Sequence, residues 1–271
     1  MKVFKLYNGV MIPAIGLGVF QLKRGKETVN TVLNALDCGY RLIDTARVYF
    51  NEKSVGEAIK KTELKREEIF VSTKMWKTAI YTHTAKMAFN NSLKRLGLDY
   101  VDLYLLHWPV KGFIDAYKAI EELYKQGKIK AIGVSNFLPR HIERLKEAGL
   151  MLPMVNQIEV NPYYQNDETV EYCQKEGIIV EAYSPFGGSK HSCLGDATLK
   201  EIASKYQVST AQVIVRWLYQ KGIVALPRSK SINHLKSNIE IDSFELDESD
   251  MEAIKKLNQN LKSGGDPEKY K

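Results

Sequence analysis

Eight short runs with the composition of β-strands alternate with segments of helical periodicity along the chain. The runs cover residues 15–19, 42–46, 69–74, 101–108, 131–137, 154–160, 178–185 and 223–229. Strands that alternate with helices are joined by helical crossovers, and such crossovers make neighbouring strands parallel. The alternation therefore predicts an α/β fold in which helices surround one parallel sheet.

The segments between the runs place apolar residues at every third or fourth position, as in residues 84–96 and 114–124. Glycines follow several of these segments, one to five residues before the next strand, and glycine is common just beyond a helix end. We expect helices to end at Gly39, Gly97, Gly127, Gly149, Gly177 and Gly222.

Eight strand–helix units account for most of the 271 residues, and no linker rich in Pro, Gly or Ser interrupts them. Barrels of eight such units often run to about 250 residues as one domain. We therefore predict a single (β/α)8 TIM barrel domain over residues 1–271. The alternative is a doubly wound sheet, which usually carries a GxGxxG loop after an early strand, and no such loop follows Gly16-Leu17-Gly18.

Two segments lie outside the repeating units. Asn8-Gly9 is flanked by alternating apolar residues, which is a strong indication of a β-hairpin, here over residues 3–13. Residues 247–271 follow the last unit, and we expect a final helix and a short tail there.

Composition indicates a globular protein and the kind of compartment in which it is expected. Hydrophobic residues make up 44% and charged residues 26%, as in a globular protein. No apolar run approaches the ~18 residues of a membrane-spanning helix, and residues 10–20 are interrupted by Pro13, Gly16 and Gly18. We expect neither a signal peptide nor a membrane segment. Three cysteines without a CxxC pair fit a reducing cytoplasm.

The net charge of +7 and pI near 9.0 would favour binding to nucleic acid, to an acidic surface or to an anionic cofactor. The basic residues are spread over predicted helices and turns, and several lie close to Glu, so we favour a solvated surface and no nucleic-acid partner.

A metal site is not expected either. His107 alone among the five histidines falls at a strand end, and neither HExxH nor His-x-His occurs.

Polar side chains fall at the carboxyl ends of seven strands, which is the end of a barrel where active sites lie. They are Asp44 with Tyr49 beyond it, Lys74, His107, Ser135-Asn136, Gln157, Tyr183-Ser184 and Arg228-Ser229. Each has a structural explanation by itself: a turn cap, a solvated lysine, a histidine bonded to backbone, a packed aromatic ring. Their combination on one rim indicates a functional site.

The motifs that carry these residues resemble the aldo-keto reductase family. They are residues 39–46 (GYRLIDTA) with Tyr49, residues 72–74 (STK), 106–109 (LHWP) and 133–137 (GVSNF). The similarity runs from Gly9 to about Pro267. It points to small, prokaryotic-type members similar to the 2,5-diketo-D-gluconate and methylglyoxal reductases. The resemblance implies a single barrel, NADPH bound in an extended form, and reversible reduction of aldehydes and ketones to alcohols.

Reduction of a carbonyl group by a nicotinamide needs a proton donor at the oxygen and a group that stabilises the developing charge. The resemblance maps Asp44, Tyr49, Lys74 and His107 onto the family's catalytic tetrad, with Tyr49 as proton donor. The Lys74 ammonium would lower the pKa of Tyr49 from about 10, and Asp44 would keep that lysine charged. His107, if neutral, would donate an N–H to the carbonyl oxygen.

The resemblance also implies the cofactor site. Ser135, Asn136 and Gln157 would bind the nicotinamide carboxamide, and Tyr183 would stack on the ring. Ser184, Phe186 and Gly188 would follow the pyrophosphate.

Arg228, Ser229, His234 and Asn238 would surround the adenosine 2′-phosphate and adenine. The family usually has Lys in place of Arg228 and Arg in place of His234, and a histidine is largely neutral at pH 7. Ser237 also replaces a frequent Glu. We therefore expect a preference for NADPH with some use of NADH.

Phe20, Trp76 and Trp108 resemble the family's aromatic substrate wall beside His107. Short segments at residues 110–113 and after Leu261 predict a shallow, open pocket that suits small aldehydes, dicarbonyls such as methylglyoxal, and keto sugar acids equally. We expect a monomer. The alternative function is an NADPH-binding sensor or scaffold with little turnover, against which the complete tetrad argues.

Overall fold

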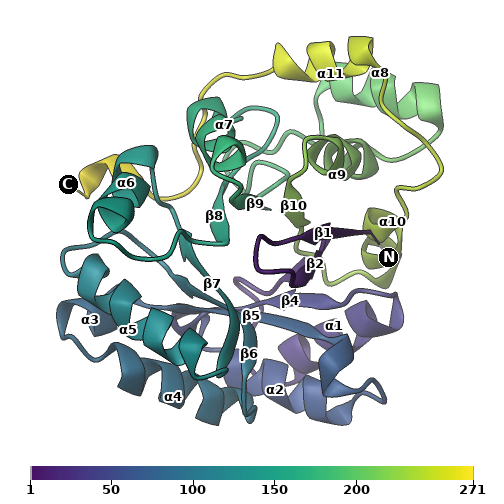
Figure 1. Ribbon diagram of the computed structural model, residues 1–271. Helices are drawn as coiled ribbons and strands as arrows, with labels where there is room; N and C mark the ends of the chain where they lie inside the picture. The colour runs from purple at the N-terminus through teal and green to yellow at the C-terminus, as the bar shows by residue number, and fades with distance from the viewer. Residues whose placement is uncertain (1, 271) are drawn as a thin grey trace.

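The computed structural model describes residues 2–270. Eight parallel strands form one sheet in the order β10-β9-β8-β7-β6-β5-β4-β3, with helices around it (Figure 1). They are β3 (Leu17–Gly18), β4 (Leu42–Asp44), β5 (Phe70–Met75), β6 (Val101–Leu106), β7 (Ile129–Ser135), β8 (Val155–Glu159), β9 (Ile179–Tyr183) and β10 (Val224–Leu226).

The two edge strands of this sheet meet. Ile15, just before β3, forms a parallel bridge with Ala225 of β10. The N–H groups of Gly16 and Gly18 donate to the carbonyl oxygens of Ala225 and Pro227 at 2.9 and 3.1 Å. The sheet is thus a nearly closed barrel, which confirms the (β/α)8 fold expected from the sequence.

Helices follow the strands as expected. They are α1 (Lys26–Asp37), α2 (Glu52–Lys61), α3 (Lys77–Tyr81), α4 (Ala85–Leu96), α5 (Phe113–Lys125), α6 (Pro139–Glu147), α7 (Asp167–Lys175), α8 (Ala197–Tyr206), α9 (Thr210–Gln220), α10 (Ile232–Ile239) and α11 (Glu248–Lys255). The six glycines expected to end helices all have positive φ, between 67° and 101°, which L-residues with side chains rarely adopt.

Most strands are shorter at their carboxyl ends than the sequence predicts. The last run was expected to reach residue 229, yet β10 ends at Leu226. Likewise β6 ends at Leu106, so that His107 lies one residue beyond it. Composition marks where a chain is extended and apolar, but the ladder of hydrogen bonds ends earlier, where the chain turns away from the barrel.

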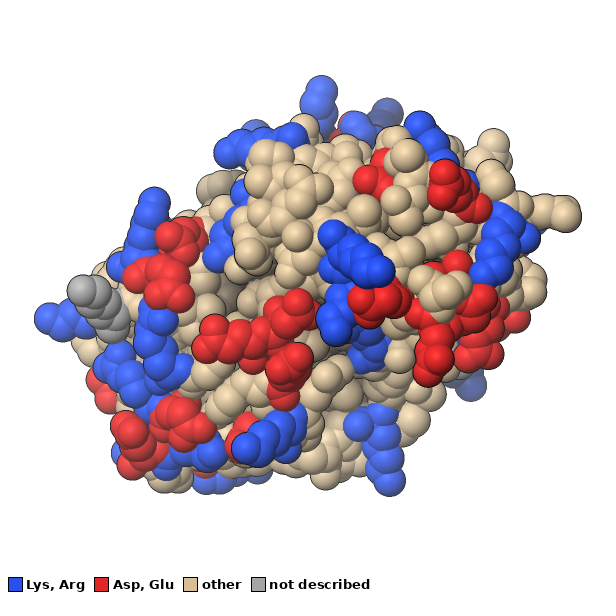
Figure 2. Space-filling view, turned by 90° about the horizontal axis from the view of Figure 1, so that it is seen from above, with Lys and Arg blue, Asp and Glu red and all other residues tan. Residues whose placement is uncertain are grey.

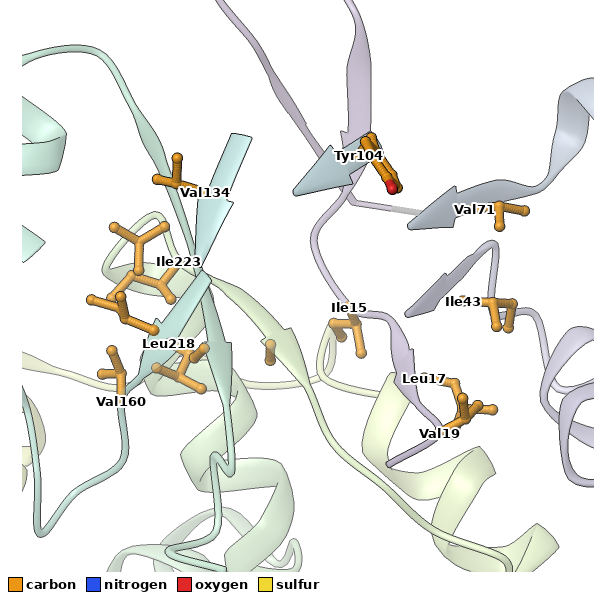
Figure 3. Close-up of a cluster of buried hydrophobic side chains, with 14 of the residues drawn as sticks. Ile15, Leu17, Val19, Ile43, Val71, Tyr104, Val134, Val160, Leu218 and Ile223 are labelled. Atoms are coloured by element: carbon orange, nitrogen blue, oxygen red, sulfur yellow. The ribbon is translucent and has the colours of Figure 1, made fainter. Parts of the chain in front are cut away.

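Side chains alternate along each strand between the barrel interior and the surrounding helices. Outward residues such as Ile43, Val71 and Val134 belong to a large core between strands and helices (Figure 3), which includes Leu218 of α9. Apolar inward residues belong to a second cluster, which includes Leu42 and Phe70, the first residues of β4 and β5.

The amino end of the barrel is closed by the hairpin. Strands β1 (Val3–Lys5) and β2 (Met11–Pro13) pair antiparallel, and Leu6 and Ile12 pack into the inward apolar cluster. In Figure 1 the hairpin, in purple, lies in the middle of the ring of strands. Only the carboxyl end of the barrel is left for polar inward side chains.

Charged side chains are interspersed rather than grouped by sign. Figure 2 shows Lys and Arg mixed with Asp and Glu on the face it presents. Ion pairs such as Lys86–Glu122, at 2.6 Å, and Lys146–Glu176, at 3.1 Å, connect them. This distribution agrees with a solvated surface.

No helix within residues 2–270 is long and apolar enough to cross a membrane.

Close packing of α2 on α4 depends on Gly56, and we predict that Gly56→Ala destabilises the fold. A Cβ there would lie 1.9 Å from the carbonyl oxygen of Leu96, so the two helices would have to move apart. The free energy of unfolding should fall by about 1–3 kcal/mol or more. Urea unfolding measures this, with Gly195→Ala as control because nothing lies within 4 Å of its added Cβ. Equal stability of the two variants would contradict the prediction.

Candidate active site

The alternation of side chains collects polar groups inside the carboxyl end of the barrel. Asp44 follows Leu42 by two residues in β4, so it shares the inward face, and Lys74 of β5 has the same parity as Phe70. Gln157 of β8 and Glu181 of β9 point inward by the same rule and lie opposite each other in the sheet register. All four side chains are buried.

Lys74 and Asp44 form a buried ion pair. The Nζ atom of Lys74 lies 2.7 Å from each Asp44 carboxylate oxygen and donates to the carbonyl oxygen of Thr45 at 3.0 Å. The Lys74 side chain has no exposed area. Burial lowers the pKa of Lys74, but Asp44, Tyr49 and Glu181 together outweigh it, so the pKa stays above its ordinary value and the lysine is charged at pH 7.

Tyr49 lies on a 3-10 turn, Arg47–Tyr49, directly above this pair. Its hydroxyl is 3.4 Å from the Nζ atom of Lys74. The turn is fixed from below, since Asn51 accepts a hydrogen bond from the Thr45 hydroxyl at 2.8 Å and donates to the carbonyl oxygen of Val19 at 2.8 Å. The structure thus brings Tyr49 to Lys74 although no strand carries the tyrosine.

The Lys74 ammonium lowers the pKa of Tyr49, as expected from the sequence, but it does not decide the net direction of the shift. Burial raises the pKa of the phenol above its ordinary value, and the opposing effect of the Lys74 ammonium is smaller. The phenol therefore keeps its proton through neutral pH. Lys74 moderates the rise in the Tyr49 pKa instead of reversing it.

His107 stands beside the tyrosine, with ring centroids 5.9 Å apart. Burial and the nearby Lys74 ammonium hold the pKa of His107 well below its ordinary value, so the imidazole is neutral at pH 7. Its Nδ1 atom is buried and has no hydrogen-bond partner among residues 2–270. The structure thus brings the four residues of the expected tetrad together at the barrel mouth.

A second polar group lies on the next strands. The Ser135 hydroxyl donates to the carbonyl oxygen of Gln157 at 2.9 Å, and Asn136 Nδ2 donates to that hydroxyl and to the carbonyl oxygen of His107, each at 3.1 Å. The Tyr183 hydroxyl donates to Asn136 Oδ1 at 2.8 Å. These bonds fix the orientation of the Tyr183 ring and of the Asn136 amide at one side of the mouth.

The chain after β9 turns sharply. Ser184 has φ of 48° and Gly188 has φ of 64°, so both adopt left-handed backbone conformations. Both are at least partly exposed, and Phe186 packs against the core. The segment therefore presents backbone groups at the rim, as expected for a stretch that accommodates a phosphate.

The segment after β10 leads into α10. Arg228 and His234 are exposed, Ser229 is partly exposed, and Asn238 is buried. The Ser231 hydroxyl caps the helix by accepting from the N–H of His234 at 3.4 Å. No ion pair to Arg228 is found in the described part of the chain. The arginine is therefore available to an anion.

Aromatic rings surround the Tyr49 hydroxyl and the His107 ring. The Phe20 ring lies 4.9 Å from the Tyr49 ring, and the Trp76 ring lies 5.2 Å from the His107 ring. Phe20 is 53% exposed, which fits an open mouth. Trp108 packs against Tyr270, with ring centroids 5.5 Å apart. Phe20 and Trp76 thus contact the site residues directly, whereas Trp108, next to His107 in the chain, packs against the C-terminal tail.

Sequence reasoning missed two carboxylates. Glu181 has the same parity as Tyr183 in its strand, so the inward alternation could have identified it. Glu159 accepts hydrogen bonds from the N–H groups of Ser263 and Gly264, at 2.9 and 2.8 Å, and so holds the C-terminal tail at the mouth. No local pattern could have revealed a contact between segments about a hundred residues apart.

The arrangement can protonate an oxygen and stabilise charge on it. A neutral phenol and a neutral imidazole lie side by side, and a buried ammonium is next to the phenol. No group of three His, Cys, Asp or Glu side chains that could hold a metal ion occurs within residues 2–270.

Comparisons with known proteins agree with these observations. The model of the aldo/keto reductase family, described as "Aldo/keto reductase family", matches residues 14–259. Glyoxal reductase of Bacillus subtilis (strain 168) is 44% identical over 97% of this chain and 95% of its own length. Methylglyoxal reductase DkgA of Escherichia coli (strain K12) is 36% identical over 99% and 98%. The crystal structure of a Bombyx mori aldo-keto reductase in complex with NADP matches with a TM-score of 0.90 and 34% identity, over 96% of this chain and 94% of that one.

The buried ion pair predicts a strong effect of Asp44→Asn on stability. The substitution leaves the Lys74 ammonium buried without a carboxylate, and breaking a buried pair in this way lowers the free energy of unfolding by about 3–5 kcal/mol. Urea unfolding at pH 7 measures the change. Glu57→Gln is the control, because Glu57 pairs with Lys61 at 2.6 Å on the surface and should contribute about 0.5 kcal/mol or less. Similar losses in both variants would refute the prediction.

Proposed function

The chain belongs to the aldo/keto reductase family, and on that premise we propose that it reduces aldehydes and ketones to alcohols with NADPH. The observation that carries the proposal is the Tyr49 hydroxyl, held 3.4 Å from the buried Lys74 ammonium and beside a neutral His107. A proton donor placed in this way is what carbonyl reduction requires of the protein.

NADPH, when bound, supplies the hydride. The chain's own residues bind and orient the carbonyl compound and provide the proton. The neutral His107 ring donates one N–H to the carbonyl oxygen and so orients it toward Tyr49. As negative charge develops on that oxygen, the Tyr49 hydroxyl transfers its proton to it. The Lys74 ammonium stabilises the phenolate that remains, and Asp44 keeps the lysine charged and in place.

The residues at the rim fit the cofactor. Ser135, Asn136 and Gln157 supply buried amide and hydroxyl groups for the carboxamide, and the fixed Tyr183 ring offers a flat face to the nicotinamide. Ser184, Phe186 and Gly188 suit the pyrophosphate. Arg228 and Ser229, before the capped start of α10, suit the 2′-phosphate, because a guanidinium and a helix start both favour an anion. His234 and Asn238 would face the adenosine.

We propose small aldehydes and dicarbonyls as substrates. The aromatic wall of Phe20, Trp76 and Trp108 suits an apolar group next to the carbonyl, and the exposure of Phe20 leaves the mouth open to compounds of different shape. Two relatives carry the names glyoxal reductase and methylglyoxal reductase, which supports dicarbonyls in particular.

Tyr49→Phe should abolish most turnover while leaving NADPH binding intact. General acid catalysis contributes about 10²–10⁴-fold, so kcat should fall by that factor, whereas the Kd for NADPH, measured by fluorescence, should stay within about twofold. Loss of NADPH absorbance with 4-nitrobenzaldehyde reports turnover, and Tyr81→Phe, on the exposed end of α3, is the matched control.

Near-normal kcat in the Tyr49→Phe variant would remove Tyr49 from the mechanism. A wild-type protein that binds NADPH tightly but turns over no aldehyde in a panel would instead be a sensor or scaffold.

Arg228→Leu should weaken NADPH binding and leave NADH binding unchanged. A hydrogen bond to a charged group contributes about 1.5–3 kcal/mol, which corresponds to roughly a tenfold to hundredfold rise in Kd. NADH is the control within the same variant, since it lacks the 2′-phosphate. An equal loss of affinity for both cofactors would show that Arg228 does not read the phosphate.

A further inference from the structure

Glu181 is a buried carboxyl group that the mechanism above does not use. It lies in the middle of β9 on the inward face, with no exposed area. Its Oε2 atom accepts a hydrogen bond from Gln157 Nε2 at 2.8 Å, and its Oε1 atom has no partner in the described part of the chain. A buried polar atom without a hydrogen-bond partner destabilises the fold, because it has lost its bonds to water and gained none in return. An apolar side chain would fill this position at lower cost, so stability alone does not explain Glu181.

The same Gln157 nitrogen also donates to Asp44 Oδ1 at 3.0 Å. The two N–H groups of the Gln157 amide thus donate to two different carboxyl groups, those of Asp44 and Glu181. Because an amide nitrogen only donates and its oxygen only accepts, two acceptors at one end determine which end carries the nitrogen. The Gln157 Oε1 atom is then directed away from both carboxyl groups, and no donor within residues 2–270 contacts it.

We propose that Glu181 is a positioning residue for the reduction: together with Asp44 it fixes the Gln157 amide so that Oε1 is left to accept an N–H of the nicotinamide carboxamide. The inference rests on the function proposed above. It also makes Glu181 part of one connected network, in which Gln157 joins it to the Asp44–Lys74 pair below Tyr49.

The charges in the network give Glu181 a second effect. The ionisable groups that face it are Asp44 from β4 and Lys74 from β5. One ammonium cannot neutralise two carboxylates in a buried space, so one of them keeps its proton. Burial, with a further contribution from Asp44, raises the pKa of Glu181 to about 8 against the opposing effects of Gln157 and Lys74.

Glu181 is therefore a neutral acid at pH 7, with its proton on Oε1 and with Oε2 still accepting from Gln157, and it becomes an anion in mildly alkaline solution. A new negative charge beside Asp44 and Lys74 disfavours the phenolate that forms on Tyr49, so reduction becomes slower. The pKa of Tyr49 itself lies above 10 and does not interfere in this range.

Glu181→Gln tests the proposal by turnover, because it keeps the shape and an acceptor oxygen for Gln157 but cannot ionise. With a pKa of about 8, roughly one tenth of wild-type Glu181 is protonated at pH 9, so wild-type kcat/KM should fall severalfold, by at most about tenfold, from pH 7 to pH 9. At pH 7 the kcat/KM of the variant should lie within about twofold of the wild-type value. Between pH 7 and pH 9 the kcat/KM of the variant should stay nearly constant. Glu201→Gln, on the exposed face of α8, is the matched control.

A second readout needs neither cofactor nor turnover. A carboxyl whose pKa is raised by folding stabilises the native state most at low pH, below the unfolded value of about 4.3, and this contribution is lost as pH rises to about 8. The Tm of Glu181→Gln relative to wild type should therefore rise between pH 5 and pH 8 and then remain constant. Wild-type and variant curves that run parallel in both Tm and kcat/KM would overturn the proposal.

Glu181→Leu tests the positioning step separately. It removes the acceptor, so Gln157 loses one of the two groups that orient it, and the Kd for NADPH should rise at least fivefold while Glu181→Gln stays within twofold. Unchanged NADPH affinity in a folded Glu181→Leu variant would overturn this step, and if that variant does not fold, the Glu181→Gln measurements decide. Absence of wild-type turnover would refute the proposed function alone, because the Tm and NADPH measurements test Glu181 without it.

Discussion

A fully buried ammonium is the constraint around which the carboxyl end of the barrel is organised. An isolated charge of this kind costs several kcal/mol to remove from water, so Lys74 is tolerated only because both oxygens of Asp44 and a backbone carbonyl surround its Nζ atom. That requirement fixes the relative positions of the ends of β4 and β5. The turn that carries Tyr49 is built on the same strand end, so the phenol meets the ammonium as a consequence of the pairing.

The two ends of the barrel have opposite character for one reason. Inward side chains fill a closed space, and the hairpin seals its amino end with Leu6 and Ile12 over an apolar layer. The polar groups lie at the opposite, carboxyl end, with this apolar layer beneath them. Low polarity beneath the site explains why burial dominates the pKa values of Tyr49, His107 and Glu181, and why hydrogen bonds to charged groups matter so much there.

Much of this could be predicted from the sequence, because two simple periodicities specify it. The strand–helix rhythm predicts the barrel, and the position of a residue at a strand end predicts that Asp44, Lys74 and His107 meet at one rim. The family motifs add Tyr49, which lies on a turn that no periodicity identifies. The direction of its pKa shift could not be predicted, since it depends on how deeply the phenol is buried and not on the nearest charge. The inward position of Glu181 follows from the alternation of side chains along its strand and could have been predicted. The contact of Glu159 with the tail could not, because it depends on the path of the last residues alone.

The bridge between Ile15 and Ala225 has a consequence for how the chain acquires its structure. The two residues are more than two hundred positions apart, so the barrel cannot close until its eighth strand has left the ribosome. Until then the strand at either end of the growing sheet has an unpaired edge, which is the kind of surface that aggregates. Contacts of such long sequence separation also slow folding. The contact that closes the barrel is therefore among the last that the nascent chain can form.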